Sequence, residues 1–500
     1  MNIKVVKTKP RDVVCDLIVL VMFNDGRKSR IMADIDKSVG GLMSQFLTLE
    51  EWKGELGKSL MLYTQKRIFA KKILLLGAGP VSGFNLETLR IIGGHCVKKS
   101  KENNTKNVAF VLDVEMLKKF NRSELIAALS DGVLLGDYRF LKYKQAELKK
   151  EKVVDELNII VDQKANVSVL QCAVNVSKVF CDATNFIRDL VNEPACVATP
   201  VYLVNVAKGL ESPYVNVQVF DKEKIVEMKM GGVLGVSRGS DEPPYFVHLT
   251  YKPRSSKKLK KIALIGKGIT FDSGGLSLKG ADHLETMKLD MAGAATVLGV
   301  FKALSIIKPM VEVHGIMALC ENMPSGKATK PGDVVTTMNG KTIEILNTDA
   351  EGRIILADSL EYAQGVKPDY IVDLATLTGA CAVALGDQIA GMMGNSRKLI
   401  DMLKKAAVSS GEKCWELPLV EEYRSLIKSD IADVKNIAKT RYGGAITAGL
   451  FLEEFVHKIP WVHLDIAGPA YAEKDSASYV SKGGTGFGVR MILTWLVNSN

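Results

Sequence analysis

Residues 262–275 read IALIGKGITFDSGG, an apolar run that passes directly into a glycine-rich segment. The run Ile262–Gly266 predicts a buried strand, and the glycines after it predict a turn. Lys267 and Asp272 would then lie at the carboxyl end of a strand. Open α/β sheets place their ligand sites at that edge, so this stretch suggests both a fold and a site.

Apolar runs and helical stretches alternate along the rest of the chain, which is typical of α/β proteins. Further strands are predicted at Leu17–Phe23, Ile73–Leu76, Val108–Leu112, Leu157–Val161, Phe246–Tyr251, Val311–Leu319, Tyr370–Leu374 and Trp461–Ile466. Helices are predicted at Leu86–Val97, Ser123–Leu129, Val167–Leu190, Ala292–Ile307 and Ile354–Gln364.

These elements predict an α/β protein of two lobes. A smaller N-terminal α/β domain would span residues 1–165, and a linking helix, residues 166–191, would stop before Pro194. A larger catalytic domain, residues 192–500, would contain a central, mostly buried sheet flanked by helices.

Composition excludes several classes of protein. Of 500 residues, 47% are hydrophobic and 24% charged, which excludes a mainly disordered chain. The eight cysteines are scattered without a C-x-x-C motif, so neither a zinc ribbon nor a disulfide framework is indicated. With only six histidines, a metal site would rely on oxygen ligands. No export signal or membrane anchor is visible, and we expect a cytoplasmic protein.

Two short motifs suggest other enzymes but fit them poorly. Gly77, Gly79 and Gly83 nearly match a dinucleotide-binding loop, but the third glycine is one place late and Pro80 removes a backbone donor. Gly235–Gly239 matches the G-x-S-x-G motif of serine hydrolases. The helix that this motif requires is replaced by a turn-forming stretch with Pro243 and Pro244.

Basic residues raise the question of an anionic partner. The formal net charge is +10, and residues 251–261 carry six basic side chains and no acid. This stretch lies between two predicted strands and has no aromatic residues interleaved among its basic ones for base stacking, so a solvated loop explains it. Nucleic-acid binding is not expected, although a catalytically idle binding protein and a nicotinamide dehydrogenase stay as alternatives.

Acidic residues form the strongest candidate site. Asp290 lies in an apolar setting, where an unpaired carboxylate would be costly. Residues 347–353 read NTDAEGR, and in an extended segment Asp349 and Glu351 would point to the same side with Arg353 beside them. If these residues meet Asp272, the crowded negative charge requires cations. A two-metal site is the simplest hypothesis.

Taken together, these segments resemble the leucyl aminopeptidases of the cytosolic, two-metal type. The matching strings are Asn192–Pro194, Gly266–Gly275, Asp290–Ala295, Glu321–Ser325, Asn347–Arg353 and Ala375–Ala380. The resemblance covers most of the second lobe and extends weakly into the first. It implies a metal-dependent exopeptidase that releases N-terminal amino acids, preferably Leu and other apolar residues, in peptide catabolism.

The resemblance also implies a role for each matching residue. One exchangeable ion would be held by Asp272, Asp349 and Glu351, and a tighter ion by Lys267, Asp272, Asp290 and Glu351. Lys279 would stabilise the oxyanion, and Arg353 would hold a bicarbonate that acts as general base. The substrate would be contacted by Met287, Thr376, Leu377, Gly379 and Ala467.

The family reaction and assembly follow from the same resemblance. Two divalent ions would activate a water molecule for attack on the peptide, and one of them would bind the free α-amine. Zn or Mn is expected, with Mg or Co possible in the exchangeable site. The partners implied are peptides with a free N-terminus and further copies of the chain in a homohexamer, with no membrane.

Overall fold

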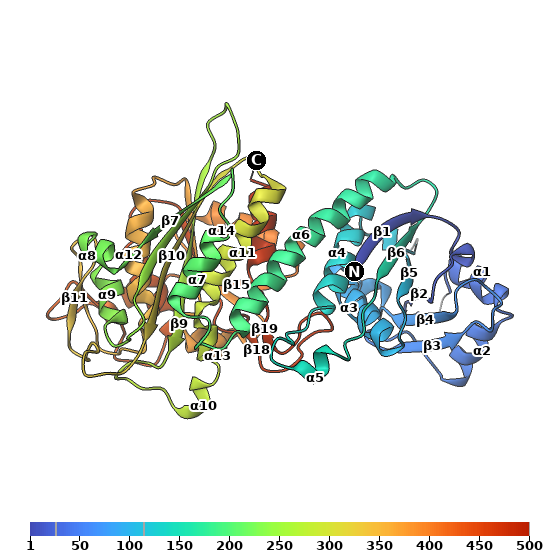
Figure 1. Ribbon diagram of the computed structural model, residues 1–500, viewed down its shortest axis with the longest axis horizontal. Helices are drawn as coiled ribbons and strands as arrows, with labels where there is room; N and C mark the ends of the chain where they lie inside the picture. Colours follow the sequence, from blue (N-terminus) through green and yellow to red (C-terminus); the bar gives the residue numbers. More distant parts are fainter. Residues whose placement is uncertain (26–27, 114–115, 500) are drawn as a thin grey trace. The chain divides into compact units, whose positions relative to one another are not determined.

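The computed structural model describes residues 1–25, 28–113 and 116–499, which form two compact units (Figure 1). The first unit comprises Met1–Asp182 together with Lys474–Ser481, and the second comprises Ala183–Glu473 with Lys482–Asn500. The division falls within helix α6 (Val167–Asn192), which confirms the helix predicted there. The domain boundaries predicted at residues 165 and 192 stay predictions.

The first unit is built on a six-stranded sheet in the order β1-β6-β5-β2-β4-β3. Neighbouring strands are parallel except β3, which pairs antiparallel with β4. The strands are β1 (Asn2–Lys7), β2 (Leu17–Met22), β3 (Ser59–Tyr63), β4 (Lys72–Gly77), β5 (Asn107–Val111) and β6 (Glu156–Val161). The helices are α1 (Arg30–Ser38), α2 (Leu42–Leu49), α3 (Leu86–Glu102), α4 (Arg122–Gly136) and the short α5 (Gln145–Leu148).

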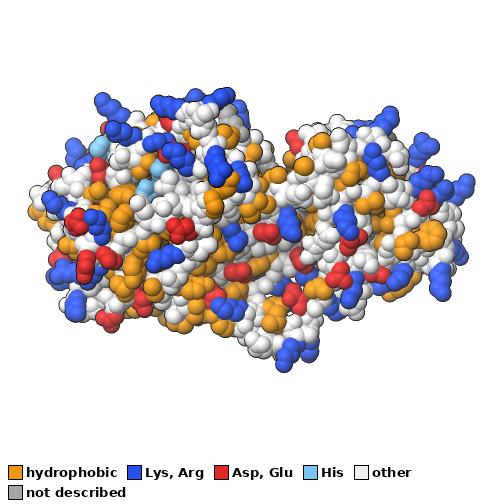
Figure 2. Space-filling view, turned by 45° about the horizontal axis from the view of Figure 1, so that its top comes forward, with side chains coloured by type: hydrophobic (Ala, Val, Ile, Leu, Met, Phe, Trp, Pro, Cys, Tyr) orange, Lys and Arg blue, Asp and Glu red, His pale blue; other side chains and the backbone are white. Residues whose placement is uncertain are grey.

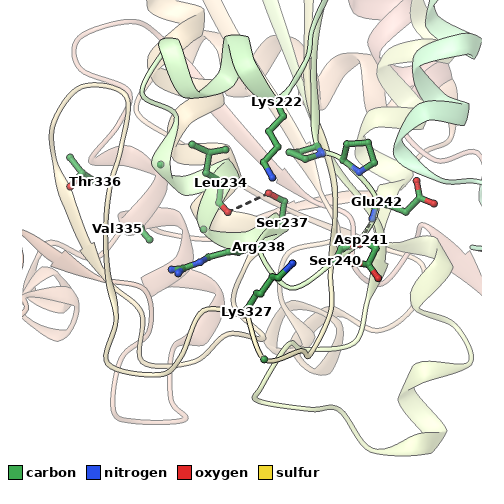
Figure 3. A pocket seen from close by; sticks show the side chains of 15 residues that line it. Lys222, Leu234, Ser237, Arg238, Ser240, Asp241, Glu242, Lys327, Val335 and Thr336 are labelled. Carbon is green, nitrogen blue, oxygen red and sulfur yellow. Dashed lines mark hydrogen bonds between the residues drawn. The ribbon is translucent and has the colours of Figure 1, made fainter.

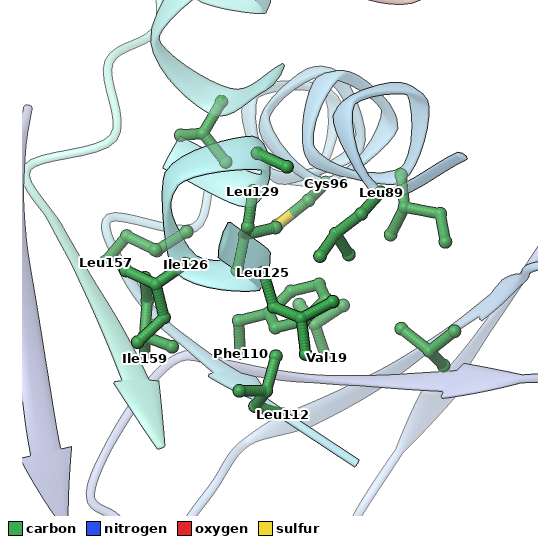
Figure 4. Packing of buried hydrophobic residues seen from close by; sticks show 14 of the residues in the cluster. Val19, Leu89, Cys96, Phe110, Leu112, Leu125, Ile126, Leu129, Leu157 and Ile159 are labelled. Carbon is green, nitrogen blue, oxygen red and sulfur yellow. The ribbon is translucent and has the colours of Figure 1, made fainter. Parts of the chain in front are cut away.

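Two apolar clusters cover the two faces of this sheet. On one face, Leu89 of α3 and Leu125 of α4 pack against Phe110 of β5 (Figure 4). On the other face, residues of α1 and α2 pack against alternate strand positions. Helices α3 and α4 approach so closely that a Cβ at Gly132 would lie 2.0 Å from the Arg90 carbonyl oxygen, and glycine at this position makes the approach possible. This is the α/β layering that the sequence predicts.

The second unit is built on an eight-stranded sheet in the order β15-β14-β17-β13-β9-β10-β8-β7. Its centre, β17-β13-β9-β10, is parallel, and antiparallel pairs flank it on both sides. The strands are β7 (Val215–Phe220), β8 (Tyr245–Tyr251), β9 (Lys261–Asp272), β10 (Glu312–Asn322), β13 (Tyr370–Ala375), β14 (Ala390–Gly394), β15 (Cys414–Glu416) and β17 (Trp461–Asp465).

Helices cover both faces of this sheet. One face packs against α8 (Lys222–Glu227), α9 (Gly231–Ser237), α12 (Gly352–Gln364) and α15 (Gly444–Glu453). The other contacts α7 (Pro200–Lys208), α11 (Ala292–Ile307) and α14 (Arg397–Ser410), with α16 (Val489–Val497) against α11 and α14. The short elements are α10 (Ala281–Leu284), α13 (Gly379–Leu385), β11 (Val334–Thr336), β12 (Thr342–Glu344), β16 (Val434–Lys435), β18 (Tyr471–Ala472) and β19 (Gly483–Gly484).

One stretch of the described chain, Met287–Ile307, is long and apolar enough to cross a membrane. It comprises a 3-10 turn (Met287–Met291) followed by α11, and 78% of its most apolar window is buried inside the fold. Its apolar character is therefore explained by packing against β9 and β13 in the core.

All the predicted strands and helices are present, and the two-lobed α/β class is confirmed. One detail differs, because β9 does not end at Gly266 but continues to Asp272. Gly266 and Gly268 are strand residues in close contact with neighbouring backbone, and a Cβ at Gly268 would lie 2.5 Å from the Ala318 carbonyl oxygen. The turn begins only at Gly274 and Gly275, where φ is positive.

A chain of buried polar side chains joins β8, β10 and α12. His248 Nδ1 lies 2.9 Å from the Tyr362 hydroxyl, and His248 Nε2 lies 3.0 Å from His314 Nδ1. His314 Nε2 in turn lies 3.0 Å from a Glu312 oxygen. Every group finds a partner when both imidazoles are neutral, and burial lowers the pKa of His248 to about 4.

Basic side chains do not gather into one patch on the face shown in Figure 2, where acidic side chains lie between them. Residues 252–260, the basic stretch noted above, connect β8 to β9. Lys252 from this loop pairs with Glu312 at 3.3 Å. The connecting-loop interpretation of this stretch agrees with its position in the fold.

Candidate active site

The central parallel strands carry the first two candidate ligands. Lys267 and Asp272 both lie on β9, and Asp272 pairs in register with Asn322 at the end of β10. The Asn322 amide donates to Asp272 Oδ1 at 2.8 Å and to the Thr348 carbonyl at 2.9 Å. Asn322 therefore holds one candidate ligand against the segment that carries Asp349.

Asp290 reaches the strand because the start of α11 presses against the sheet. A Cβ at Gly266 would lie 2.6 Å from the Ala294 Cα, and a Cβ at Gly293 would lie 2.1 Å from the Leu374 carbonyl oxygen. Only glycine permits this approach. Asp290 Oδ1 then lies 2.7 Å from Lys267 Nζ and accepts a 2.7 Å hydrogen bond from the Thr376 hydroxyl.

A tight turn after β9 brings Lys279 back to Asp272. Gly274 and Gly275 have φ of +86° and +62°, and a Cβ at Gly275 would lie 2.8 Å from Asn322 Oδ1. The turn brings Lys279 Nζ to 2.8 Å from Asp272 Oδ2 and 2.5 Å from Asp349 Oδ1.

Glu351 and Arg353 are positioned by a helix and not by an extended segment. Glu351 is the residue that precedes α12 and has helical dihedral angles (φ −80°, ψ −34°), while Arg353 lies in the first turn of α12. The expectation of alternating side chains over residues 349–353 is therefore wrong. Glu351 still faces the cluster, with Oε1 2.8 Å from Lys267 Nζ, because Gly352 lets the lysine chain lie directly against the helix start.

Six charged side chains line one cavity of about 690 Å³: Lys267, Asp272, Lys279, Asp290, Asp349 and Glu351. Oxygens of Asp272, Asp290 and Glu351 lie within 4.8 Å of one another, and all three residues are buried. Burial raises the pKa of Asp290 well above its usual value and also raises that of Glu351. Burial alone would lower the pKa of Lys267, but the surrounding carboxylates raise it. The protonation of each group in the cluster therefore depends on the charge of its neighbours.

Its charge and its unpartnered atoms suit divalent cations. With all four carboxylates ionised, the cluster would exceed its two ammonium groups by two negative charges, and the raised pKa values of Asp290 and Glu351 reflect this crowding. Asp290 Oδ2 and Glu351 Oε2 are buried and have no hydrogen-bond partner. An oxygen-rich set with one amine suits Zn, Mn, Mg or Co, so the residues fit the metals that the sequence suggests.

Arg353 follows Glu351 by two residues but is not among the described residues that line this cavity. Its side chain is buried, and Nη1 donates to the Asn436 carbonyl at 2.6 Å. Burial lowers the pKa of Arg353 to about 10, and its Nε has no partner. A buried guanidinium with a free donor suits an anion.

The residues predicted to contact substrate line the same cavity: Met287, Thr376, Leu377, Gly379 and Ala467. Asp465, at the end of β17, joins the segment that carries Leu377 to the segment that carries Ala467. It accepts hydrogen bonds from Leu377 N at 3.2 Å, Ala467 N at 3.1 Å and the Thr378 hydroxyl at 2.7 Å. More polar residues complete the lining: His283, Asp387, Tyr471 and Glu473.

A second cavity, of about 760 Å³, contains Ser237 of the G-x-S-x-G match (Figure 3). Ser237 lies at the end of helix α9, and its hydroxyl donates to the Leu234 carbonyl at 3.3 Å. The residues that line this cavity include Lys222, Arg238 and Lys327 but no histidine among those described. The described lining therefore lacks the histidine that activates the serine of a Ser-His-Asp triad.

Comparison with known proteins identifies the family. The model of the "Cytosol aminopeptidase family, catalytic domain" matches residues 185–493, and that of the family's N-terminal domain matches residues 19–147. The chain belongs to the cytosol aminopeptidase family. This confirms the resemblance to leucyl aminopeptidases, and metal-dependent removal of N-terminal residues is the activity that the family implies.

Relatives of this family match over the whole chain. Proteins named "Probable cytosol aminopeptidase" from Sulfurihydrogenibium sp. and Persephonella marina are 43% and 45% identical, over 99% and 100% of this chain and 97% and 100% of theirs. A mutant of tomato leucine aminopeptidase superposes with a TM-score of 0.91 at 35% identity, covering 100% of this chain and 97% of its own. The chain is thus a hydrolase of the aminopeptidase class.

A further solved structure is the bottromycin maturation enzyme BotP in complex with Mn. It matches with a TM-score of 0.84 at 31% identity, covering 97% of this chain and 99% of its own.

Three side chains important to this aminopeptidase site were not assigned a role from sequence: Asn322, Asn436 and Asp465. Asn322 lies in one of the matching strings, which marks the segment but not the task of its amide. Asn436 and Asp465 act on backbone groups that are far away in sequence, and no local pattern signals such contacts.

Proposed function

We propose that this protein is a two-metal aminopeptidase that releases Leu and other apolar residues from the N-terminus of peptides. The observation that carries the proposal is the cluster of Lys267, Asp272, Asp290 and Glu351, all buried, with the half-buried Asp349 beside them and two unpartnered carboxylate oxygens. A cluster of this charge is costly to bury unless it binds cations.

We assign the ligands as the resemblance implies. Asp272, Asp349 and Glu351 would hold an exchangeable ion, and Lys267, Asp272, Asp290 and Glu351 a tighter one. Bound divalent ions would polarise the scissile carbonyl and lower the pKa of a water molecule. Lys267 would have to lose its proton to become a ligand, so metal uptake releases a proton. Zn and Mn are the proposed metals, and the Mn complex of BotP supports Mn.

The chain's own residues supply the remaining parts. Lys279 contacts Asp272 and Asp349, and once these carboxylates bind metal its ammonium is free to donate to the developing oxyanion. Arg353, buried and with Nε unpartnered, would hold a bicarbonate that accepts the proton of the attacking water. Leu377 would contact the peptide backbone.

The pocket lining supports a preference for apolar side chains. Met287, Thr376, Gly379 and Ala467 offer mostly apolar surface beside the cluster, and Gly379 has open space at its Cβ position. Burial of a substrate side chain such as Leu in an apolar pocket stabilises the complex by about 0.8 kcal/mol for each methylene group removed from water.

Assembly and location are part of the proposal. We propose a cytoplasmic homohexamer, because the matching relatives are named cytosol aminopeptidases and the resemblance implies six copies. Light scattering should then give about six times the 54.5 kDa of one chain.

The test is hydrolysis of leucine amide by metal-stripped protein, before and after addition of Zn or Mn. We expect activity only with metal. Asp349→Asn should bind one ion less and lose most activity, whereas Asp401→Asn, an exposed carboxylate on α14, should behave as wild type. Full activity of the stripped protein, or of Asp349→Asn, would sink the mechanism.

A further inference from the structure

Asn436 connects several parts of the candidate active site, although it is not among the described residues that line the two large cavities. It follows β16, which pairs in parallel with β12, and its backbone N–H donates to the Glu344 carbonyl at 3.0 Å. The side chain is fully buried. This placement sets its amide beside the segment 346–350, which is almost ninety residues away in sequence.

All the hydrogen-bonding capacity of the Asn436 amide is directed at the backbone of that segment. Oδ1 accepts from Leu346 N at 2.9 Å and from Asn347 N at 3.4 Å. Nδ2 donates to the Asn347 carbonyl at 2.6 Å and to the Ala350 carbonyl at 3.3 Å. The N–H and carbonyl groups on the two sides fix which amide atom is which.

The same residue also anchors Arg353. The Asn436 carbonyl accepts the 2.6 Å hydrogen bond from Arg353 Nη1. One residue thus bonds to the segment on both sides of Asp349 and to the arginine that follows Glu351. Side chains of similar size do not replace this amide, because aspartate would set an oxygen against two carbonyls and leucine would leave four groups unpaired.

We propose that Asn436 is a positioning residue that sets Asp349 and Arg353 for binding of the exchangeable metal ion and the anion. The proposal rests on the ligand assignment of the proposed function. Asp349 is the ligand assigned only to the exchangeable ion, and its backbone lies between the two carbonyls that Asn436 holds. The tighter ion depends more on β9 and on Asp290, which Asn436 does not contact.

Substitution of Asn436 should therefore weaken the binding of one metal ion much more than that of the other. Replacing an outer residue that orients a ligand typically weakens metal binding by about 10- to 100-fold. For Asn436→Ala and Asn436→Asp we expect a loss of this size for the weaker of two Mn²⁺ ions, with the tighter ion near its wild-type affinity. A merely structural role would lower the melting temperature and weaken both ions in proportion.

The experiment is a Mn²⁺ titration of the metal-stripped full-length protein, with free Mn²⁺ followed by electron paramagnetic resonance and the metal-free melting temperature recorded in parallel. Asn436→Ser keeps one donor and one acceptor, so it should fold and lie between wild type and Asn436→Ala. Asn395→Ala is the matched control, because Asn395 also bridges two backbone groups (Trp461 N and the Ile459 carbonyl) but lies away from the cluster.

The outcomes separate this proposal from the proposed function. If wild-type protein binds fewer than two Mn²⁺ ions, the ligand assignment fails and the positioning role fails with it. If wild type binds two ions but Asn436→Ser and Asn436→Ala match it, or weaken both ions equally, the assignment survives and the role of Asn436 is refuted. Activity that returns in the variants at high Mn²⁺ supports the proposal.

Discussion

Lys279 shows how one side chain can have two tasks in succession. Without metal, its ammonium lies against Asp272 and Asp349 and neutralises part of their charge, and those carboxylates raise its pKa above the usual value. Burial opposes this rise, so the charged state is maintained by its partners. Beside these two carboxylates Lys279 is therefore held as a cation, which is the charge state that an oxyanion stabiliser needs.

Replacing Lys279 by Met should test that task. We expect kcat to fall by about 10²- to 10³-fold, as for loss of one oxyanion donor, while two Mn²⁺ ions still bind. Lys327→Met, in the second cavity, is the control and should keep its activity. A variant that loses metal and activity together would show that Lys279 serves the ions instead.

His248 makes stability depend on pH. Its pKa is lowered from 6.5 to about 4, mainly by burial and next by His314, so the native imidazole stays neutral while the unfolded one gains a proton below pH 6.5. Its contribution is therefore complete above about pH 6.5 and is lost as the pH falls towards 4. At 1.36 kcal/mol per unit, the loss is about 3 kcal/mol.

Urea unfolding at pH 7.5 and pH 5 measures this effect. The wild type should lose more stability between the two values than His248→Gln does. His457→Gln, at an exposed histidine, should keep the wild-type difference. Equal differences for His248→Gln and wild type would contradict the assignment.

At the scale of elements, the contact between β9 and the start of α11 decides where Asp290 lies. Gly266 and Gly293 remove the side chains that would hold the helix away, and the 3-10 turn before α11 then carries Asp290 to Lys267. The small residues at 292–295 thus allow the helix to lie close enough to the sheet for Asp290 to contact Lys267.

Gly266→Ala should therefore affect both fold and site. Its methyl group would lie 2.6 Å from the Ala294 Cα, and overpacking of this kind costs about 1–3 kcal/mol. We expect a lower melting temperature and weaker binding of the tighter Mn²⁺ ion. Gly326→Ala, where nothing lies within 4 Å of the new methyl group, is the matched control.

At the scale of the whole molecule, the first unit is completed by residues from near the end of the chain. The Tyr479 hydroxyl donates to Glu87 at 2.6 Å, and the Ser478 hydroxyl donates to the Ile91 carbonyl at 2.6 Å. Tyr479 is buried in a small apolar cluster with Leu135 and Cys181. The segment 474–481 therefore contributes the buried Ser478 and Tyr479 to the first unit.

Tyr479→Ala should destabilise the first unit by about 3–5 kcal/mol, as removal of large buried side chains does. In calorimetry, the transition of this unit should move to lower temperature while that of the second unit stays. Tyr63→Ala, at an exposed position on β3, is the control. A shift of the second transition alone would contradict the division into units.

Features with a local signal could be predicted from the sequence. Apolar runs such as Ile73–Leu76 marked buried strands, and the matching strings contain Asp272, Asp290 and Asp349, which line one cavity in the structure. Backbone conformation and distant partners could not be predicted, as for Glu351, whose helical conformation replaces the expected extended one. Asn436 could not be found because its partners lie almost ninety residues away and backbone groups leave no trace in a sequence.

The place of segment 474–481 has a consequence for synthesis on the ribosome. The 182 residues that begin the first unit emerge before the rest, but Tyr479 follows only after the intervening stretch Ala183–Glu473. At about 5–20 residues per second, that stretch takes on the order of 15–60 seconds to translate. During this time the surface that Tyr479 later covers, including Leu135 and Cys181, is exposed, so the first unit has an uncovered apolar surface until translation is nearly finished.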